Sequence, residues 1–510
     1  MPIAASDWYA AVPSGSLMRR RLADRDRFAS MSDEHPERED KYDVASDFVL
    51  PDLSVDASID RVETARYDLE ATYFDTPEGF LQRHRITLRR RKGGKDAGWH
   101  LKLPAESSRT EIHVESQARA VPRELSALLL GIRRGRQLSP TVTISTVREA
   151  HLLLDDSGAS LAEVADDTVH VLSADAEGVR EWREVEVELG PAGDEHLLSV
   201  IGQRLRETGA KPSASASKLA RARGDVAPDT PGHKRLAGLV DDYLQAQYRA
   251  IFEGDLALRR ELNAVHRTRV AVRRLRSTVR TFGELFESAA ADALEAELVW
   301  VAGVLGAVRD LDILQDRLNT AVATLPGEFV LGPVAGRLES RLSADRAAAY
   351  RRLRKAMNGK RYLALLELLE AWRVEPPFTK AAGARRAAAS TYVAKAERRM
   401  RKRLGAALEP DAPDQLLHRA RKAEKRYRYA CELAQPVLGQ QSEQAIKRAK
   451  GVQKLLGEFQ DAVVSADVLR RLGATAGSSS GENGFTYGVL LAQEWEVMRS
   501  VRDEVRREYG

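Results

Sequence analysis

Charged side chains of both signs alternate with other residues at the start of "EREDKYDV", residues 37–44. Because alternate side chains of a β-strand point to the same face, Glu37, Glu39 and Lys41 would share one strand face. Carboxylates bind Mg²⁺ and Mn²⁺ through hard oxygen ligands, whereas lysine and arginine bind phosphate oxygens through charge-assisted hydrogen bonds. A strand face with both signs of charge therefore suits a phosphate chain that carries a divalent cation.

Four later segments repeat this alternation. The residues that share a parity are Thr87, Arg89 and Arg91; His100 and Lys102; Glu163 and Asp167; and Glu184, Glu186 and Glu188. One such strand alone is typical of a sheet with a solvated polar face. Carboxylates on some strands and guanidinium groups on others favour a closed sheet, in which acidic strands lie across the interior from basic ones.

Eight segments between residues 37 and 190 have β-strand composition and turn residues at their ends. They are 37–44, 65–76, 85–93, 98–104, 110–116, 141–155, 160–172 and 182–190. Helical segments are expected near 122–133 and 193–209, and most of the chain after residue 232 has helical patterning. The predicted fold class is multi-domain α+β: an antiparallel eight-stranded β tunnel or barrel, followed by an all-α domain.

Composition limits the class of protein. A length of 510 residues exceeds one ordinary domain, and 43% hydrophobic with 30% charged residues fits a soluble globular protein. Cys431 is the only cysteine, which excludes an intrachain disulfide and fits a reducing compartment. The sequence has no apolar run near the roughly 20 residues of a membrane span and no apolar signal core at its start. We therefore expect a cytoplasmic protein without a membrane partner.

The chain divides by composition into four parts. Residues 1–34 lack the patterning of a fold and are either a disordered basic extension or a mis-annotated start, with Met31 as the true first residue. A β domain is expected at 35–225, a linker at 226–232 and a helical domain at 233–505. The net charge of +5 is uneven, because arginines are dense in the second half. That asymmetry indicates a polyanionic partner for the helical domain.

The ordered series of charged strands resembles the CYTH family, the triphosphate tunnel metalloenzymes. After the E-x-E-x-K opening, the resemblance is carried by "LRRR", "HLKL", "EVADD", "EVEVEL" and "SASKLARA", in this order. It covers about residues 35–225 and implies an eight-stranded antiparallel tunnel that binds triphosphate compounds with Mg²⁺ or Mn²⁺. The activities of that family include inorganic triphosphatase, thiamine triphosphatase and adenylate cyclase.

The resemblance also implies roles for individual residues. The expected metal ligands are Glu37, Glu39, Glu184 and Glu186; the expected catalytic residues are Lys41, Arg148 and Asp167; the expected substrate-binding residues are Arg89, Arg91, Lys102 and Lys218. Hydrolysis would proceed by in-line attack of water on a terminal phosphorus, with positioning and charge stabilisation lowering the barrier. The segment "TVTISTVR", 141–148, supplies only Arg148 where the family pattern has a more basic strand, which favours binding over turnover.

The helical half contains an internal repeat. "VHRTRVAVRRLR", 265–276, aligns with "LHRARKAEKRYR", 417–428, and "LGAVRDLD", 305–312, aligns with "LGEFQDAV", 456–463. The aligned pairs are His266 and His418, Arg269 and Arg421, Arg273 and Lys425, Arg276 and Arg428, Gly306 and Gly457, and Asp310 and Asp461. The offsets barely change between the two segments, which indicates duplication.

The spacing of the first repeat gives a helix with two stripes. His266, Arg269, Arg273, Arg276 and Arg280 form a basic stripe, beside an apolar stripe of Leu262, Val265, Val272, Leu275 and Val279. Nothing local offsets the repulsion between like charges, so an anionic partner is one interpretation. The alternative is a solvated basic face paired with acids of neighbouring helices. The two aligned aspartates are expected to pair with an arginine, and the preceding glycines to allow close helix approach.

The twin basic stripes resemble the CHAD family, the conserved-histidine α-helical domains, over about residues 233–505. The resemblance implies two four-helix bundles that face each other across a basic groove and bind inorganic polyphosphate. The residues expected to bind it are His266, Arg269, Arg273, Arg276, His418, Arg421, Lys425 and Arg428. CYTH and CHAD domains joined in one chain are a known arrangement, and both imply the same class of ligand.

Three functions remain open from the sequence. The leading hypothesis is a metal-dependent triphosphatase whose helical domain binds polyphosphate, and the alternative is a non-catalytic polyphosphate-binding protein. Nucleic-acid binding is disfavoured because aromatic residues make up only 6% of the chain. Adenylate cyclase activity ranks low, since no base-binding segment is evident. A cytoplasmic location with association to polyphosphate granules is expected, and the oligomeric state does not follow from the residues.

Overall fold

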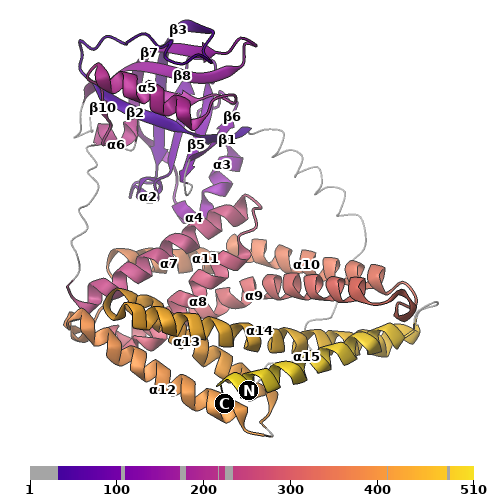
Figure 1. The fold of residues 1–510 in the computed structure, drawn as a ribbon. Helices are drawn as coiled ribbons and strands as arrows, with labels where there is room; N and C mark the ends of the chain where they lie inside the picture. Colours follow the sequence, from indigo (N-terminus) through magenta and orange to yellow (C-terminus); the bar gives the residue numbers. More distant parts are fainter. Residues whose placement is uncertain are drawn as a thin grey trace. The chain divides into compact units, whose positions relative to one another are not determined.

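The computed structural model describes residues 33–104, 109–172, 180–215, 217–223, 234–410, 412–478 and 483–509. These residues fall into two compact units that divide at residue 230. The first unit is built around one β-sheet, and the second is helical (Figure 1). The predicted fold class, an antiparallel β tunnel followed by an all-α domain, is confirmed.

The described residues of the first unit form ten strands, all paired antiparallel. They are β1 (Asp33–Glu37), β2 (Glu39–Val44), β3 (Arg61–Asp75), β4 (Thr87–Lys92), β5 (Gly98–Pro104), β6 (Arg109–Val114), β7 (Ser139–Leu154), β8 (Ser160–Val171), β9 (Glu181–Leu189) and β10 (Lys211–Pro212). Their order in the sheet is β1-β6-β5-β4-β3-β7-β8-β9-β2-β10.

One interrupted strand closes this sheet. Only Arg38 separates β1 from β2, yet β1 pairs with β6 and β2 pairs with β9, at the opposite end of the strand order. The two edges are therefore joined by a continuous stretch of chain. If β1 and β2 are counted as one strand, eight long strands surround the interior, as the sequence predicts. The two-residue β10 adds to β2 from outside this ring.

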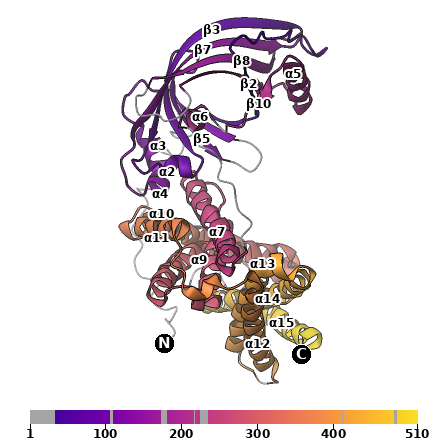
Figure 2. The same ribbon diagram turned by 90° about the vertical axis from the view of Figure 1, so that its left-hand side faces the viewer.

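Helix α5 covers part of the outer face of the closed sheet, and the alternation of the sequence explains how. On β9, Val185 and Val187 are buried in an apolar cluster with Leu197, Ile201 and Leu205 of helix α5 (Glu195–Glu207). Figure 2 shows α5 outside the sheet beside β2 and β10. The alternate glutamates of β9 therefore point inward. Burial of apolar surface, at about 25 cal/mol per Å², thus fixes which parity faces the tunnel.

Four short helices complete the first unit. They are α2 (Phe80–Arg83), α3 (Arg123–Leu128), α4 (Leu130–Arg133) and α6 (Lys218–Arg223). The backbone N–H groups that begin α2 are bound by a side chain, because Asp75 accepts hydrogen bonds from Leu81 and Gln82 at 2.9 and 3.1 Å. Helix α6 bears directly on function, because it carries Lys218 to the inner wall of the sheet.

The second unit contains nine α-helices among its described residues. They are α7 (Leu236–Arg259), α8 (Val265–Thr281), α9 (Ser288–Thr324), α10 (Val334–Met357), α11 (Lys360–Val374), α12 (Ala389–Leu408), α13 (Asp414–Leu438), α14 (Gln440–Thr475) and α15 (Phe485–Tyr509). Helices α7 to α10 pack in succession, and so do α12 to α15. The aligned basic segments lie on α8 and α13, which contact each other. Each four-helix set thus holds one copy of the repeat, with α11 added to the first.

The apolar stripe of α8 is buried with one exception. Val265, Val272, Leu275 and Val279 are at most 2% exposed, whereas Leu262 is 45% exposed. The expectation for Leu262 is wrong because α8 begins only at Val265, so Leu262 lies ahead of the helix. Helical spacing predicts burial only for residues that lie within the helix.

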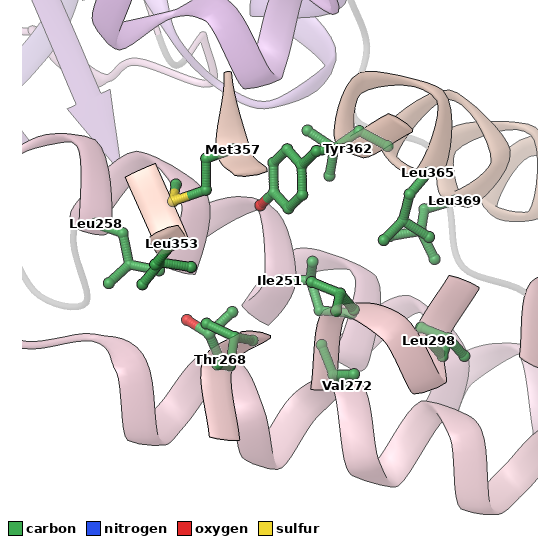
Figure 3. Close-up of a pocket in the computed structure, with 13 residues that line it drawn as sticks. Ile251, Leu258, Thr268, Val272, Leu298, Leu353, Met357, Tyr362, Leu365 and Leu369 are labelled. Atoms are coloured by element: carbon green, nitrogen blue, oxygen red, sulfur yellow. The ribbon is translucent and has the colours of Figure 1, made fainter. Parts of the chain in front are cut away.

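A small apolar cavity lies in the core of the first helical set (Figure 3). Its lining includes Ile251, Val272 and Leu298, with Thr268 as a polar member. The Thr268 hydroxyl donates to the carbonyl of Ala264 at 2.8 Å, so it presents no free donor. This cavity is a packing feature of the core. Within the described part of the chain, no helix combines the length and apolar composition that crossing a membrane requires.

Candidate functional site

The interior of the closed sheet holds a cavity of about 280 Å³ with a mainly polar lining. The predicted residues that line it are Glu39, Lys41, Arg89, Arg91, Lys102, Arg148, Glu186 and Lys218. Asp167 and Glu184 lie behind this lining, fully or nearly fully buried. The structure therefore brings together acids and bases from β2, β4, β5, β7, β8, β9 and α6, as the alternation of charge predicts.

Three carboxylates form the acidic centre of the tunnel. Oxygen atoms of Asp167, Glu184 and Glu186 lie within 4.8 Å of one another, and no other described residues form such a group. Asp167 and Glu184 are register partners across β8 and β9. Three clustered carboxylates are the hard oxygen ligands that Mg²⁺ and Mn²⁺ prefer, so this set could hold a divalent cation. Asp167, expected to act beside the metal ligands, thus lies among them.

Lys218 neutralises this acidic centre. Its ammonium nitrogen lies 3.0 Å from Asp167, 2.6 Å from Glu184 and 2.8 Å from Glu186. Burial works against ionisation of Asp167 and Glu186, but Lys218 and its basic neighbours outweigh it and lower both pKa values. The acids are therefore ionised at neutral pH, which is the state that binds a cation.

Arg148 interacts with three acidic side chains. Its guanidinium donates to both oxygens of Asp167 at 2.8 and 2.7 Å and to Glu186 at 2.9 Å, and it reaches Glu163 at 3.5 Å. Lys41 is similarly held between Glu186 and Glu39. Both bases therefore orient carboxylates. Most of their N–H donors are directed at these acids, so they would act on a bound anion mainly through their positive charge.

The other bases form a separate wall on β4 and β5. Arg89 lies 3.9 Å and Lys102 lies 3.8 Å from Glu111 of β6, and Arg91 pairs with Asp96 of the β4–β5 loop. The contacts of Arg89 and Lys102 to this acid are longer than those of Arg148 to Asp167, whereas Arg91 forms a close pair with Asp96. The wall therefore presents charge into the cavity, which suits it to phosphate oxygens.

The E-x-E-x-K motif spans the interruption in the closing strand. Glu37 ends β1 opposite Arg109 of β6, whereas Glu39 begins β2 opposite Glu188 of β9. The side chain of Glu37 lies outside the described part of the structure, so its expected metal contact stays a prediction. Glu39 lines the tunnel, and Lys41 and Lys102 outweigh the effect of burial and lower its pKa.

Glu111 is a tunnel residue that sequence reasoning missed. It stands opposite Lys102 in the register of β5 and β6, lines the cavity, and lies 2.8 Å from His100 Nδ1. The available signal was its parity in "TEIHVES", where Glu111 and Glu115 share a strand face and alternate with apolar residues. The segment alone does not show which of the two acids meets a base across the sheet.

Arg221 and Trp182 were also missed, and both hold Glu184. The Trp182 indole donates to Glu184 at 2.6 Å, and Arg221 lies 3.8 Å from the same carboxylate while it pairs with Asp43. The Arg221 guanidinium also lies over the Trp182 ring, 5.1 Å from its centre. Arg221 follows Lys218 by one turn of α6, so one helical face carries both contacts. These residues position one ligand of the acidic centre.

The helical unit gathers the two basic stripes into one cluster. Lys425 on α13 is half-buried and feels the charges of Arg421 and Arg428 on its own helix and of Arg269 and Arg273 on α8. Contact between α8 and α13 brings the two repeats together, and Arg273 donates to the Tyr429 hydroxyl at 2.8 Å. We define these five residues (Arg269, Arg273, Arg421, Lys425 and Arg428) as the basic cluster.

The glycines and aspartates of the second repeat segment serve the arginines of this cluster. A Cβ atom at Gly306 would lie 3.3 Å from Arg269 Nη2, and one at Gly457 would lie 3.2 Å from Arg421 Nη2. Arg269 pairs with Asp310 at 3.3 Å, and Arg421 interacts electrostatically with Asp461. The expected pairing of aspartate with arginine is confirmed. The sequence predicts that these glycines allow close approach of a helix, whereas the group that lies close to each glycine is an arginine guanidinium.

Acids offset the charge at one end of the stripes. Arg276 and Arg280 share Glu295 of α9 at 3.3 and 3.1 Å. Glu432 accepts from Arg274 at 2.9 Å and lies 3.4 Å from Arg428. For Arg276 and Arg280 this pairing matches the alternative interpretation, a basic face paired with acids of neighbouring helices. The partner of Arg428 comes from the next turn of its own helix.

The two aligned histidines begin the stripes as expected, near the start of α8 and α13. Burial and the neighbouring arginines lower the pKa of His266, and burial with Lys422 lowers that of His418. His418 Nδ1 lies 2.7 Å from the Gln460 side-chain oxygen, to which it donates. Both rings are therefore mainly neutral at pH 7.

Comparison with known proteins identifies the class. The CYTH domain family model matches residues 35–222, and the CHAD domain family model matches residues 242–470. Two proteins from strains of Mycobacterium tuberculosis, Uncharacterized protein MT2285 and Uncharacterized protein Rv2226, are 35% identical to this chain over 497 residues, which covers 92% of this chain and 95% of each relative. The chain therefore belongs to the family of proteins that join a CYTH domain to a CHAD domain.

Solved structures resemble single units of the chain. PptA from Streptomyces chartreusis is 23% identical and has a TM-score of 0.47, covering 54% of this chain and 98% of that protein. The CHAD domain from the plant Ricinus communis is 25% identical with a TM-score of 0.42, covering 55% of this chain and 95% of that domain. CYTH domains as a family bind triphosphate substrates, depend on a divalent metal and include triphosphatases and cyclases.

Proposed function

We propose that the β unit hydrolyses inorganic triphosphate or a related triphosphate compound with Mg²⁺ or Mn²⁺, and that the helical unit binds inorganic polyphosphate. The observation that carries the first part is the acidic centre of Asp167, Glu184 and Glu186 at one wall of a tunnel whose opposite wall is basic. A metal–triphosphate complex presents both signs of charge in this way.

In this proposal the tunnel residues have three roles: binding the phosphate chain, holding the cation and orienting the acids. Arg89, Arg91 and Lys102 bind the oxygens of the phosphate chain and hold it in line for attack by water. Asp167, Glu184 and Glu186 would hold the cation, which supplies charge neutralisation and a bound water of lowered pKa. Lys41, Arg148 and Lys218 orient these acids and keep Asp167 and Glu186 ionised. No serine, cysteine or histidine nucleophile takes part.

A second candidate function is binding without turnover. It is favoured by the engagement of Arg148, whose guanidinium is directed mainly at acids, so that strand β7 adds little donor capacity for phosphate. A protein of this kind would hold polyphosphate in both units and would associate with polyphosphate granules in the cytoplasm.

Phosphate release from tripolyphosphate separates the two functions. Purified protein is assayed with Mg²⁺, with Mn²⁺ and with a chelator, beside a Glu37→Gln, Glu39→Gln double variant and a Glu186→Gln variant. Glu63→Gln, an exposed acid on β3, is the matched control. We expect metal-dependent release that falls at least about 100-fold in both tunnel variants and persists in the control. Glu186→Gln removes a ligand of the acidic centre, and the double variant removes the two acids that the CYTH resemblance implies as further metal ligands.

Two results would redirect the assignment. No release from wild-type protein that still binds tripolyphosphate would establish the binding function. Conversion of ATP to cyclic AMP at a rate above phosphate release would make the tunnel a cyclase.

For the helical unit, binding of long-chain polyphosphate is compared with binding of single-stranded DNA at equal phosphate concentration and fixed salt. Tighter DNA binding would contradict the polyphosphate assignment.

A further inference from the structure

One position distinguishes the two copies of the basic repeat. Arg273 in the first copy aligns with Lys425 in the second, so the basic cluster contains four arginines and one lysine. Arginine keeps its charge throughout the physiological pH range, whereas lysine can lose its proton when it is desolvated or surrounded by cations. Lys425 is therefore the member of the cluster whose charge can change.

The surroundings of Lys425 favour the neutral amine. Arg421 and Arg428 lie on its own helix, and Arg269 and Arg273 come from α8. Within the described residues, no carboxylate lies within ion-pair distance of its nitrogen. Burial first, and then these four guanidinium groups, lower the pKa of Lys425 from 10.5 to about 6. The free cluster thus holds one amine that is mainly uncharged at neutral pH.

The acids near the cluster are already engaged elsewhere. Asp310 pairs with Arg269, and Asp461 faces Arg421. Glu432 accepts hydrogen bonds from Arg274 and from the Tyr243 hydroxyl. Glu424 is buried against Arg428, and its burial raises its pKa to about 7. Other nearby titratable groups are His266 and His418, which begin the two basic stripes, and Lys422 and Tyr429 on α13.

We propose that the basic cluster binds its polyanion together with a proton, and that Lys425 is the group that takes up this proton. The inference rests on the proposed polyphosphate binding of the helical unit. Phosphate oxygens placed among the four arginines reverse the sign of the local field and favour the ammonium form. Binding and protonation then assist each other, because linked equilibria are reciprocal.

The coupling makes affinity depend on pH in a defined direction. Between the pKa of free Lys425, about 6, and its higher value in the complex, the complex holds about one proton more than the free protein. Affinity therefore falls by up to about tenfold for each unit of pH increase in that range. Arg273, the aligned residue of the first repeat, cannot contribute to this pH dependence of affinity, because its charge is constant.

Calorimetric titration with long-chain polyphosphate tests the proposal. The full chain is titrated at pH 8 in buffers of different ionisation enthalpy, which measures proton uptake directly. Long chains are used because their internal phosphates stay ionised at this pH. We expect uptake of about one proton per occupied cluster in the wild type and nearly none in Lys425→Arg, which should still bind. Lys422→Arg, which changes the exposed lysine one turn away, should keep the uptake.

The outcomes separate this inference from the proposed function. No binding by the wild type would overturn polyphosphate binding itself, and the inference with it. Binding with equal uptake in the wild type and in Lys425→Arg would overturn the inference alone, and so would uptake that is lost in a His266→Gln, His418→Gln variant but kept in Lys425→Arg. Arg273→Lys provides a second test, because it introduces a second titratable amine and should raise the uptake at pH 8.

Discussion

The ammonium nitrogen of Lys218 lies 2.6 Å from a carboxylate oxygen of Glu184, which ties helix α6 to the inner wall of the tunnel. The same nitrogen contacts Asp167 and Glu186, so one lysine, contributed after the last long strand, neutralises three buried acids. These contacts make α6 part of the tunnel, although it adds no strand to the sheet.

Replacement of Lys218 by methionine should destabilise the β unit and make its stability depend on metal. Loss of one partner from a buried ionic network costs about 3–5 kcal/mol, which corresponds to roughly 10 °C in melting temperature for a unit of this size. Mg²⁺ or Mn²⁺ should restore part of this loss by binding the freed acids. Differential scanning calorimetry with and without metal measures both effects.

The control for this experiment is Lys211→Met, an exposed lysine on β10. It should leave the melting temperature and its response to metal unchanged. A Lys218→Met variant that melts like the wild type, or that gains no more from metal than the wild type does, would show that Lys218 does not hold the acids together.

Glu424 should make the stability of the helical unit decrease as the pH rises. Burial raises its pKa from 4.5 to about 7, and its Oε2 atom has no hydrogen-bond partner. The folded state thus keeps a proton that the unfolded state releases between pH 4.5 and 7. The stability from this group is complete below pH 4.5 and lost as the pH rises through 7.

Glu424→Gln should remove this dependence, because the amide does not ionise. Between pH 4.5 and 8 the wild type should lose about 3 kcal/mol of unfolding free energy relative to the variant. Urea unfolding across this pH range measures the difference, with the exposed Glu443→Gln as the control. Parallel pH profiles for the wild type and Glu424→Gln would contradict a raised pKa.

Gly306→Ala should weaken polyphosphate binding without unfolding the helix. The new methyl group would lie 3.3 Å from Arg269 Nη2 and would shift this guanidinium away from its position beside Asp310. We expect a several-fold loss of affinity, less than the roughly tenfold that one lost charge-assisted contact costs. Fluorescence anisotropy with labelled polyphosphate measures it.

Gly303→Ala is the matched control, because a Cβ atom at Gly303 of the same helix meets no atom within 4 Å. That change should stabilise α9 slightly and leave the affinity unchanged. Equal affinities for the two alanine variants would mean that the approach of Arg269 to Gly306 has no part in binding.

The parity of charged residues was enough to predict the inner face of the tunnel. Val185 and Val187 alternate with Glu184 and Glu186, and in a strand this alternation must divide the residues between two faces. A local pattern therefore assigns each side chain to the inside or the outside. It leaves open which inner residues meet, because strand register and the approach of α6 are set by distant parts of the chain.

The contacts that could not be predicted are those that join distant segments. Arg221 reaches Glu184 and Asp43 only once α6 has folded against the sheet. Arg276 finds Glu295 on another helix, so its charge density looks unbalanced in the sequence and is partly balanced in the fold. The repeat itself was visible, because duplicated spacing survives without knowledge of the contacts that it makes.

The interruption of the closing strand at Arg38 has a consequence for synthesis of the chain. The partner of β1, β6, follows about 70 residues after it, whereas the partner of β2, β9, follows only after about 140 further residues. During synthesis β2 must therefore wait without β9 while most of the tunnel is made, and Lys218 arrives later still. The three carboxylates of the acidic centre gain their lysine just before translation reaches the arginine-rich helices.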